Sequence, residues 1–443
     1  MGAYLFRTRS NHFKMSAPLR VAAVQLRAHD RCDFPKRLEH IVERIGQAAS
    51  QADLVVLPEA TFPGYVLGAE AIDETAIEAA VKRLCEIAAA TLTVIVAGIA
   101  VAGSDGTRNG AIVVDADGSL AGRADKLFLW HFDRRWFVRG DRLEPIPTRL
   151  GVLGVLICAD GRLPTIARTL VDRGAIMLVM PTAWVTSGRD PLALENVQAD
   201  LLARVRAYEN RVPFVAANKC GSELGMVAYC GKSQIVDESG NVVAIASEHQ
   251  PELLQASVTP PRERARRTVL AQPAPRAMRL REAFRLAISF DPLPGDVDAR
   301  LETLDDQFAL SPDDGDRFAA LDRVLPAALV GDEVVLDPAG LVPYRRAGYR
   351  LICWTAQLND GWTRPIARAR ALELRLYIVV FDRAARHAFA VDPDGAIVAG
   401  TFEDYRLASF TLDPRKTEET VVAPGTDVAE GLAHVETLAS TRC

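Results

Sequence analysis

The sequence contains no apolar segment of the roughly 18 or more residues that a membrane-spanning helix needs. Its first 20 residues also lack the apolar core of a secretory signal peptide. These two absences predict a soluble protein with no membrane partner. The opening segment, MGAYLFRTRSNHFK, is basic and free of acidic residues, and Met15 is as suitable a start of translation as Met1. We expect residues 1–18 to form a disordered tail.

Cysteine is scarce as well, and basic residues are not in excess. The seven cysteines are scattered without a CxxC pair or a Cys/His spacing typical of metal ligands. The sequence therefore predicts no disulfide framework, no metal site and a reducing, cytoplasmic location. With 52 Lys and Arg against 57 Asp and Glu, the net charge is -5, which offers no basic surface for nucleic acid.

The length and the periodicity indicate two α/β domains. A chain of 443 residues is two to three times the usual domain size. In its first half, apolar strand patterns alternate with helical patterns, which is typical of a layered α/β sheet. The helical patterns are 34–52, 73–91, 165–172 and 196–209. Two segments with a central turn, GAIVVDADGSLAG and KSQIVDESGNVVAIAS, predict β-hairpins.

One apolar run ends on a cysteine. Residues 152–157 carry no charge and are followed by Cys158, an Asp-Gly pair and a helical pattern. This pattern predicts a buried strand with Cys158 at its carboxyl end, where layered α/β folds hold ligands. A single cysteine at such a place is more often structural. The polar residues predicted at neighbouring strand ends favour a chemical role instead.

Three polar residues are candidates to accompany Cys158. Glu59 directly follows the apolar run DLVVLP, which would leave its carboxylate partly desolvated, as a general base requires. Lys126 follows the first predicted hairpin among apolar and aromatic neighbours, and Asp133 lies seven residues further on. Asp133 would pair with Lys126 and keep its ammonium group charged and oriented. A cysteine nucleophile needs such a base and such an oxyanion donor.

Three segments in this order, PEATFPGY, DKLFLWHFDRRWFVRGD and LICADGRLP, resemble the catalytic signatures of the nitrilase superfamily of carbon-nitrogen hydrolases. The resemblance covers residues 19–258. It implies a four-layer αββα sandwich, in which Glu59 is the general base, Lys126 the oxyanion donor and Cys158 the nucleophile. The backbone amide of Ala159 would also bind the oxyanion, and no cofactor would be needed.

The chain departs from the family pattern at one position, and a second pattern indicates which branch of the family it resembles. Many family members have a glutamate where this chain has Asp133, so its role carries over with a shorter side chain. The Cys-x-Asp-x-Arg pattern of Cys158, Asp160 and Arg162 is similar to that of amidases. We therefore expect a small-molecule amide or N-carbamoyl substrate. The alternatives are an acyltransferase, a nitrilase, ammonia supply to a synthetase, for which no GxxxxGK[ST] loop is present, or a binding pseudoenzyme without activity.

Aromatic residues near the motifs are candidates for the pocket wall. Tyr65, Trp130 and Trp184 are predicted to bind substrate, with Phe132 as a further candidate, although each is equally suited to the core. The adjacent Arg134 and Arg135 fit a solvated face or an interface better than a carboxylate site.

The second half resembles a shortened copy of the first. A Pro-rich and Arg-rich linker over 263–280 would separate a catalytic domain over 19–262 from a degenerate nitrilase-like domain over 281–425, with a tail over 426–443. Five pairs of segments match in the same order. They are FRLAISFDP with LRVAAVQLR, VVLDPAGLVPY with VVLPEATFPGY, RALELRLYIVVFD with RAYENRVPFVAAN, AVDPDGAIVA with IVDESGNVVA, and SFTLDPR with SVTPPR.

These matches predict a second half without activity. They place Pro338 at the position of Glu59 and leave no counterpart of Lys126, while Cys353 falls on the strand after the nucleophile. Members of the superfamily are similar in pairing subunits face to face. The resemblance therefore implies an intramolecular pseudo-dimer, in which the second domain covers the pairing face of the first. Further association into homo-oligomers stays open.

Overall fold

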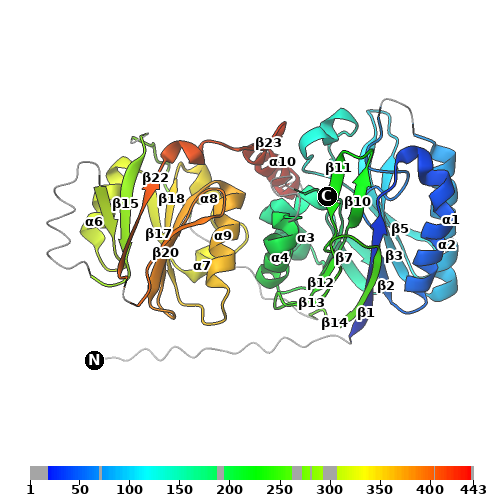
Figure 1. Cartoon of the computed structure of the whole chain (residues 1–443), viewed down its shortest axis with the longest axis horizontal. Coiled ribbons are helices and arrows are strands. Elements are labelled where there is room, and N and C mark those ends of the chain that lie inside the picture. The colour runs from blue at the N-terminus through cyan, green and yellow to red at the C-terminus, as the bar shows by residue number, and fades with distance from the viewer. Residues whose placement is uncertain are drawn as a thin grey trace.

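The structure is a computed structural model. It describes residues 18–68, 72–186, 194–261, 272–279, 282–292, 307–403 and 405–440. The predicted N-terminal tail, apart from Pro18, and most of the predicted linker lie outside these residues. Figure 1 shows two α/β halves side by side, with the first half at the right and the second half at the left.

The first sheet of the first half has eight strands in the order β11-β10-β1-β2-β3-β4-β5, with β14 beside β1. Along β1, Ala22 and Val24 face helices α1 and α2, while Val21 and Ala23 face the opposite side. Both faces of the sheet are thus buried, which explains the nearly continuous apolar runs. The elements are β1 (Leu19–Arg27), α1 (Phe34–Ala49), β2 (Leu54–Val56), α2 (Glu74–Thr91), β3 (Val94–Val101), β4 (Arg108–Val114), β5 (Leu120–Asp125), β10 (Lys219–Glu223), β11 (Val227–Cys230) and β14 (Glu252–Val258).

The second sheet has the order β13-β12-β9-β8-β7-β6, and α3 and α4 cover its outer face (Figure 1). The predicted four-layer αββα sandwich is therefore confirmed, and so are both hairpins, β4–β5 and β12–β13. The predicted helix over 196–209 contains a π-helical turn, Gln198–Leu202, before α4. The elements are β6 (Ile146–Thr148), β7 (Gly151–Val155), α3 (Pro164–Asp172), β8 (Met177–Pro181), α4 (Ala203–Asn210), β9 (Phe214–Ala217), β12 (Gln234–Val236) and β13 (Val242–Ile245).

The second half also contains two larger sheets, β16-β15-β22 and β17-β18-β19-β20-β21. Its helix α9 lies against α4, and one hydrophobic cluster continues from the core of the first half into the sheet of β17 to β20. The elements are β15 (Phe284–Ser289), β16 (Gln307–Leu310), α6 (Gly315–Val324), β17 (Ala327–Val330), α7 (Asp332–Val335), α8 (Val342–Arg346), β18 (Leu351–Ala356), α9 (Thr363–Leu374), β19 (Tyr377–Asp382), β20 (His387–Val391), β21 (Ile397–Gly400) and β22 (Leu407–Leu412).

The strand pairings of the two halves follow the same pattern. β15 pairs in parallel with β16 and antiparallel with β22, as β1 pairs with β2 and β14. The order from β17 to β21 matches that from β7 through β8, β9 and β12 to β13. Even the irregularity between Ile235 and Val236 recurs between Ala390 and Val391.

One of the five predicted matches is wrong. Val334 and Val335 of VVLDPAGLVPY lie in helix α7, whereas Val55 and Val56 of VVLPEATFPGY lie in a strand. A short apolar run does not by itself distinguish the two structures, so Pro338 is not the counterpart of Glu59. When the equivalent strand pairs of the two halves are aligned and the alignment is continued past the strand ends, Asp313 falls at the position of Glu59 and Asp332 at that of Cys158.

The prediction of a C-terminal tail over 426–443 is also wrong. Beyond the hairpin of β23 (Val421–Ala423) and β24 (Thr426–Asp427), the chain forms helix α10 (Val428–Ser440). The buried residues Val428, Leu432 and Val435 are spaced by four and three, which is a helical stripe that the sequence already contains. This helix packs on both α3 and α9.

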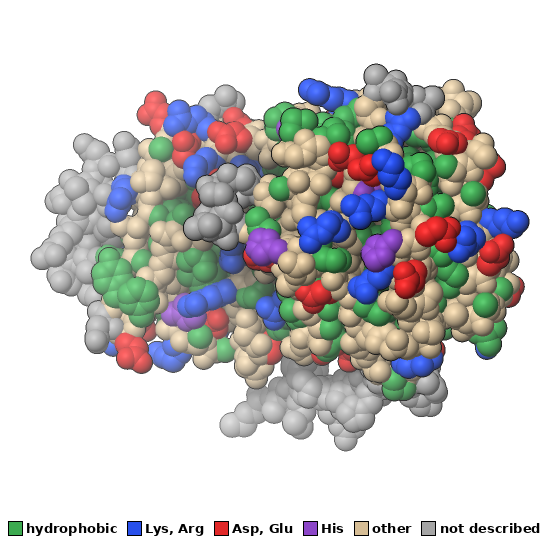
Figure 2. All heavy atoms as spheres, turned by 45° about the vertical axis from the view of Figure 1, so that its right-hand side comes forward, with side chains coloured by type: hydrophobic (Ala, Val, Ile, Leu, Met, Phe, Trp, Pro, Cys, Tyr) green, Lys and Arg blue, Asp and Glu red, His purple; other side chains and the backbone are tan. Residues whose placement is uncertain are grey.

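Within the part of the chain that the structure describes, none of the helices is long and apolar enough to span a bilayer. On the face shown in Figure 2, acidic and basic side chains lie side by side.

Gly98 of β3 allows the loop that carries Glu59 to lie against the sheet. A Cβ atom at Gly98 would lie 2.4 Å from the carbonyl oxygen of Pro58 and 2.6 Å from Cα of Glu59. We predict that Gly98→Ala lowers the free energy of unfolding by ~1–3 kcal/mol. Gly46→Ala, in α1 where a Cβ meets nothing within 4 Å, is the control and should stabilise by up to ~1 kcal/mol. Urea unfolding followed by tryptophan fluorescence measures both, and equal stability of Gly98→Ala and wild type would contradict the steric argument.

Candidate active site

Cys158 stands at a sharp turn after β7. Its backbone φ is 48°, in the left-handed region, and a short 3-10 helix, Cys158–Arg162, begins there. The carboxylate of Asp160 accepts hydrogen bonds from the backbone N–H groups of Ile157, Leu127 and Phe128, at 2.8 to 3.0 Å. Asp160 therefore fixes the Cys158 turn and ties it to the segment that follows Lys126.

Glu59 is completely buried beside this turn. Its Oε1 accepts hydrogen bonds from Asn109 Nδ2 at 2.6 Å and from Lys126 Nζ at 2.8 Å. The other oxygen, Oε2, is buried without a hydrogen-bond partner among the described residues. One side of the carboxylate is thus held in place, while the other is free to accept a proton.

Lys126 lies between two carboxylates. Its Nζ is 2.8 Å from Glu59 and 2.7 Å from Asp133 Oδ2, and all three side chains are fully buried. Asp133 also accepts hydrogen bonds from Tyr65 Oη at 2.5 Å and from Trp130 N at 2.8 Å. Burial alone would lower the pKa of Lys126, but Asp133 and Glu59 raise that pKa well above its ordinary value. The ammonium group is therefore charged, and the shorter Asp133 does reach it.

A second buried ion pair supports the loop that carries Tyr65. Lys219 Nζ lies 2.7 Å from Glu223 and donates to Ala60 O at 3.2 Å. Glu223 in turn accepts from the backbone N–H groups of Tyr65 and Val66. Sequence reasoning missed this pair and Asn109, although polar residues next to the apolar strand patterns AIVV and PFVAA were a signal. Within the described residues, no group of three or more His, Cys, Asp or Glu side chains could hold a metal ion.

A cavity of about 1000 Å³ opens onto Cys158. Three of the four predicted substrate-binding residues, Tyr65, Trp130 and Trp184, line it, as does Phe132. Ala159 does not, because its side chain is completely buried behind Cys158. Residues from the later part of the chain also line it, including Arg375, Asp392 and Val421–Ala423.

Arg162 contributes a positive charge to this cavity. Its guanidinium lies over the ring of Trp130, 4.6 Å from the centroid, and burial lowers the pKa of Arg162 to about 10. It makes no ion pair within the residues that the structure describes. Arg134, by contrast, pairs with Glu430 at 3.0 Å, which agrees with the expected interface role.

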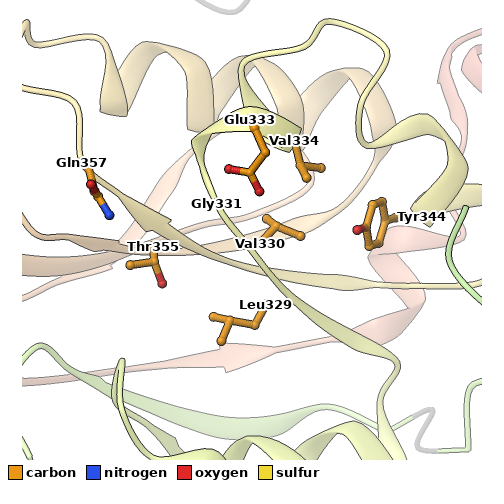
Figure 3. A pocket seen from close by; sticks show the side chains of 8 residues that line it. All are labelled: Leu329, Val330, Gly331, Glu333, Val334, Tyr344, Thr355 and Gln357. Atoms are coloured by element: carbon orange, nitrogen blue, oxygen red, sulfur yellow. The ribbon is translucent and has the colours of Figure 1, made fainter. Parts of the chain in front are cut away.

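The second half has a smaller pocket of about 330 Å³ near the equivalent strand ends, β17 and β18 (Figure 3). Its side chains include Glu333, Tyr344 and Gln357 but neither a thiol nor a lysine. Asp332, at the register position of Cys158, accepts a hydrogen bond from Trp354 Nε1 at 2.8 Å. Cys353 lies fully buried within β18, as expected.

The fold and the buried cluster of a thiol, an ammonium group and carboxylates define an α/β protein with an enzyme-like site. The model of the carbon-nitrogen hydrolase family matches residues 20–268, more than half of the chain. The chain therefore belongs to this family, within the nitrilase superfamily.

Individual relatives are similar over about half of the chain. The chain is 32% identical over 224 residues to a nitrilase of Pyrococcus abyssi, which covers 48% of this chain and 80% of the relative. It is 28% identical over 228 residues to an (R)-stereoselective amidase of a Pseudomonas species, covering 51% and 80%. Among solved structures, a carbon-nitrogen hydrolase of Helicobacter pylori is 25% identical with a TM-score of 0.49, covering 54% and 89%.

The charge of Glu59 acts on the Cys158 thiol. Burial and the Glu59 carboxylate raise the pKa of Cys158 to about 12, while Lys126 opposes them. Glu59→Gln should lower this pKa, so that the thiolate fraction at pH 8 to 10 rises about tenfold for each unit. We predict faster alkylation of Cys158 by iodoacetamide in this variant, followed by mass spectrometry of its peptide. Glu39→Gln on the exposed face of α1 is the control. Alkylation of Glu59→Gln at the wild-type rate would show that the charge does not reach the thiol, and slower alkylation would show that Glu59 acts on it mainly as a proton acceptor.

Proposed function

We propose that the first half is a thiol hydrolase that cleaves an amide or N-carbamoyl carbon-nitrogen bond through a thioester, without a cofactor. The observation that carries the proposal is the buried group of Glu59, Lys126 and Asp133 beside Cys158, at the floor of a cavity large enough for a small molecule.

In the first step, Glu59 Oε2 accepts the thiol proton as the sulfur of Cys158 attacks the substrate carbonyl. Negative charge then develops on the carbonyl oxygen. Lys126 Nζ and the backbone N–H of Ala159 would stabilise it, and one such donor is typically worth about 3 to 4 kcal/mol in the transition state. Both carboxylates that hold Lys126 are in place before the reaction, so little reorganisation is needed.

In the second step, Glu59 gives its proton to the leaving nitrogen as the carbon-nitrogen bond breaks, which leaves a thioester on Cys158. A water molecule then loses a proton to Glu59 and attacks the thioester carbonyl. Collapse of this intermediate releases the acid and returns the proton to the thiol. Asp133 takes no proton in this scheme, because its role is to hold Lys126.

The substrate class rests on the turn after the nucleophile. The Cys158, Asp160 and Arg162 pattern supports an amide or carbamoyl substrate over a nitrile. Arg162 in the cavity has no ion-pair partner among the residues that the structure describes, which suits a substrate with a carboxylate. One relative carries the name of an amidase and another that of a nitrilase. Acyl transfer to an amine, nitrile hydrolysis and binding without catalysis are the alternatives.

A screen of ammonia release tests the proposal. The panel contains short aliphatic amides, ω-amides of dicarboxylic acids, N-carbamoyl amino acids and the matching nitriles. We predict turnover of an amide or carbamoyl compound by the wild type and background rates for Cys158→Ala, with the fold retained. A loss of several kcal/mol of stability in Cys158→Ala would mark the thiol as a packing residue instead. Turnover of nitriles alone, or of nothing, would overturn the proposed activity.

We further infer that the second half, residues 281–425, is a degenerate copy that acts as a pseudo-subunit. Its strand pairings support this origin, and Asp332 at the nucleophile position supports the loss of activity. The face that it covers is formed by α3 and α4.

Helices α4 and α9 meet through a buried group of four charges. Arg206 pairs with Glu209 of its own helix and Glu373 of the other, and Arg370 pairs with Glu373 and Glu209. All four side chains are fully buried. Each arginine pairs with the glutamate of its own helix and with the glutamate of the other helix, so the two halves contribute equivalent residues. Such reciprocity is typical of a two-fold interface. Arg206 Nε also donates to Gly161 O at 2.9 Å, three residues after Cys158.

Loss of Arg370 would leave the two buried carboxylates of Glu209 and Glu373 with Arg206 as their one cation in this group, so that one buried negative charge is uncompensated. We predict that Arg370→Met lowers the free energy of unfolding by roughly 3–5 kcal/mol. Arg383→Met, which removes an exposed pair with Asp313, should cost at most ~1 kcal/mol. After cleavage at a protease site inserted in the linker, the wild-type halves should co-elute in gel filtration, whereas those of Arg370→Met should separate more readily. Wild-type halves that separate at once would refute the pseudo-subunit.

A further inference from the structure

The last part of the chain returns from the second half to the first. We call residues 421–440 the C-terminal strap; it comprises β23, β24 and α10. In Figure 1 the strap lies between the two halves, beside α3. Besides packing on α3 and α9, the strap contacts the segment Lys126–Gly140 of the first half, which carries both Lys126 and Asp133.

The strap binds the short 3-10 helix that contains Asp133. The hydroxyl oxygen of Thr426, which is fully buried, accepts a hydrogen bond from His131 N at 2.6 Å. The carboxylate of Glu430 pairs with Arg134 at 3.0 Å and Arg139 at 2.8 Å. His131 and Arg134 flank Asp133 in the sequence, so the strap holds the turn on both sides of that residue.

The strap also contacts the segment Lys126–Gly140 near both of its ends. Gly431 lies so close to the ring of Phe128 that an added Cβ would be 2.6 Å from it. His434 Nε2 lies 3.0 Å from the carbonyl oxygen of Gly140, whose N–H donates to Lys126 O at 2.9 Å. The backbone around Lys126 is therefore fixed from the strap as well as from Asp160.

The strap also reaches the cavity itself. Residues Val421–Ala423 line the cavity that opens onto Cys158, together with residues of the first half. One segment thus borders the space for the substrate and supports the turn that orients the Lys126 ammonium.

We propose that the C-terminal strap is a positioning element of the active site, with Thr426 and Glu430 as its positioning residues. The inference rests on the proposed function of Lys126 and Asp133. A five-residue 3-10 helix with two adjacent arginines has little stability of its own. Without the strap, Asp133 would leave Lys126 more often, and the ammonium would lose its fixed direction toward the oxyanion.

Two substitutions at Thr426 test this directly in the full-length protein. Thr426→Val keeps the shape and removes the acceptor for His131 N, whereas Thr426→Ser keeps the acceptor. We expect the backbone amides of Asp133, Trp136 and Phe137 to exchange hydrogen about five- to tenfold faster in Thr426→Val, in line with one lost hydrogen bond. For the fastest amide of the panel above, kcat should fall while KM stays within about twofold. Thr426→Ser should match the wild type in both measurements.

A matched pair on α10 provides the second test. Glu430→Gln removes the ion pairs with Arg134 and Arg139 and should reproduce the effects of Thr426→Val. Glu436→Gln, on the same helix, removes a carboxylate that pairs with Arg346 of the second half and should change neither measurement.

Three outcomes would overturn the proposal: unchanged exchange in both Thr426→Val and Glu430→Gln, equal effects of Thr426→Ser and Thr426→Val, or faster exchange with an unchanged kcat. Hydrogen exchange does not depend on turnover. A wild type without any hydrolase activity would therefore refute the proposed function, while the exchange rates would still decide whether the strap holds the turn.

Discussion

The site depends on one buried cation. Lys126 has no contact with solvent, and an ammonium group in such a place is stable only when it is paired and hydrogen-bonded. Two carboxylates supply that pairing, from the ends of two different segments. The position of Glu59 after β2, the turn that carries Asp133, and the close approach at Gly98 all serve this requirement, because a displacement of either carboxylate would remove one of the two partners of the buried ammonium group.

The same surroundings affect Cys158, which we propose as the nucleophile. Burial and the nearby Glu59 carboxylate raise the pKa of the Cys158 thiol to about 12, although Lys126 opposes them. The resting thiol is therefore neutral. In the proposed mechanism, proton transfer to Glu59 accompanies the attack, so the protein does not have to maintain a buried thiolate between reaction cycles.

Much of the first half could be predicted from the sequence, because its signals are local. The apolar run before Cys158, the Asp-Gly turn of the first hairpin and the helical spacing in α1 each specify an element within a few residues. Polar residues beside a strand pattern could mark Lys219 as a candidate, but the role of its pair with Glu223 could not be predicted, because that role depends on contacts with Tyr65 and Val66 far away in the chain. The segment VVLDPAG gave an error of a different kind. Its local similarity to a strand of the first half suggested a strand, whereas the fold has a helix there.

The return of the strap to the first half has a consequence for the order of events during synthesis. The strands from β1 to β14 can pair as soon as they have left the ribosome, and the first half can then acquire its core. The segment that borders the cavity and supports Asp133 is translated only after the whole second half. A nascent chain would therefore carry a folded but incompletely assembled site, and the thiol that we propose as the nucleophile would reach its final surroundings only late in translation.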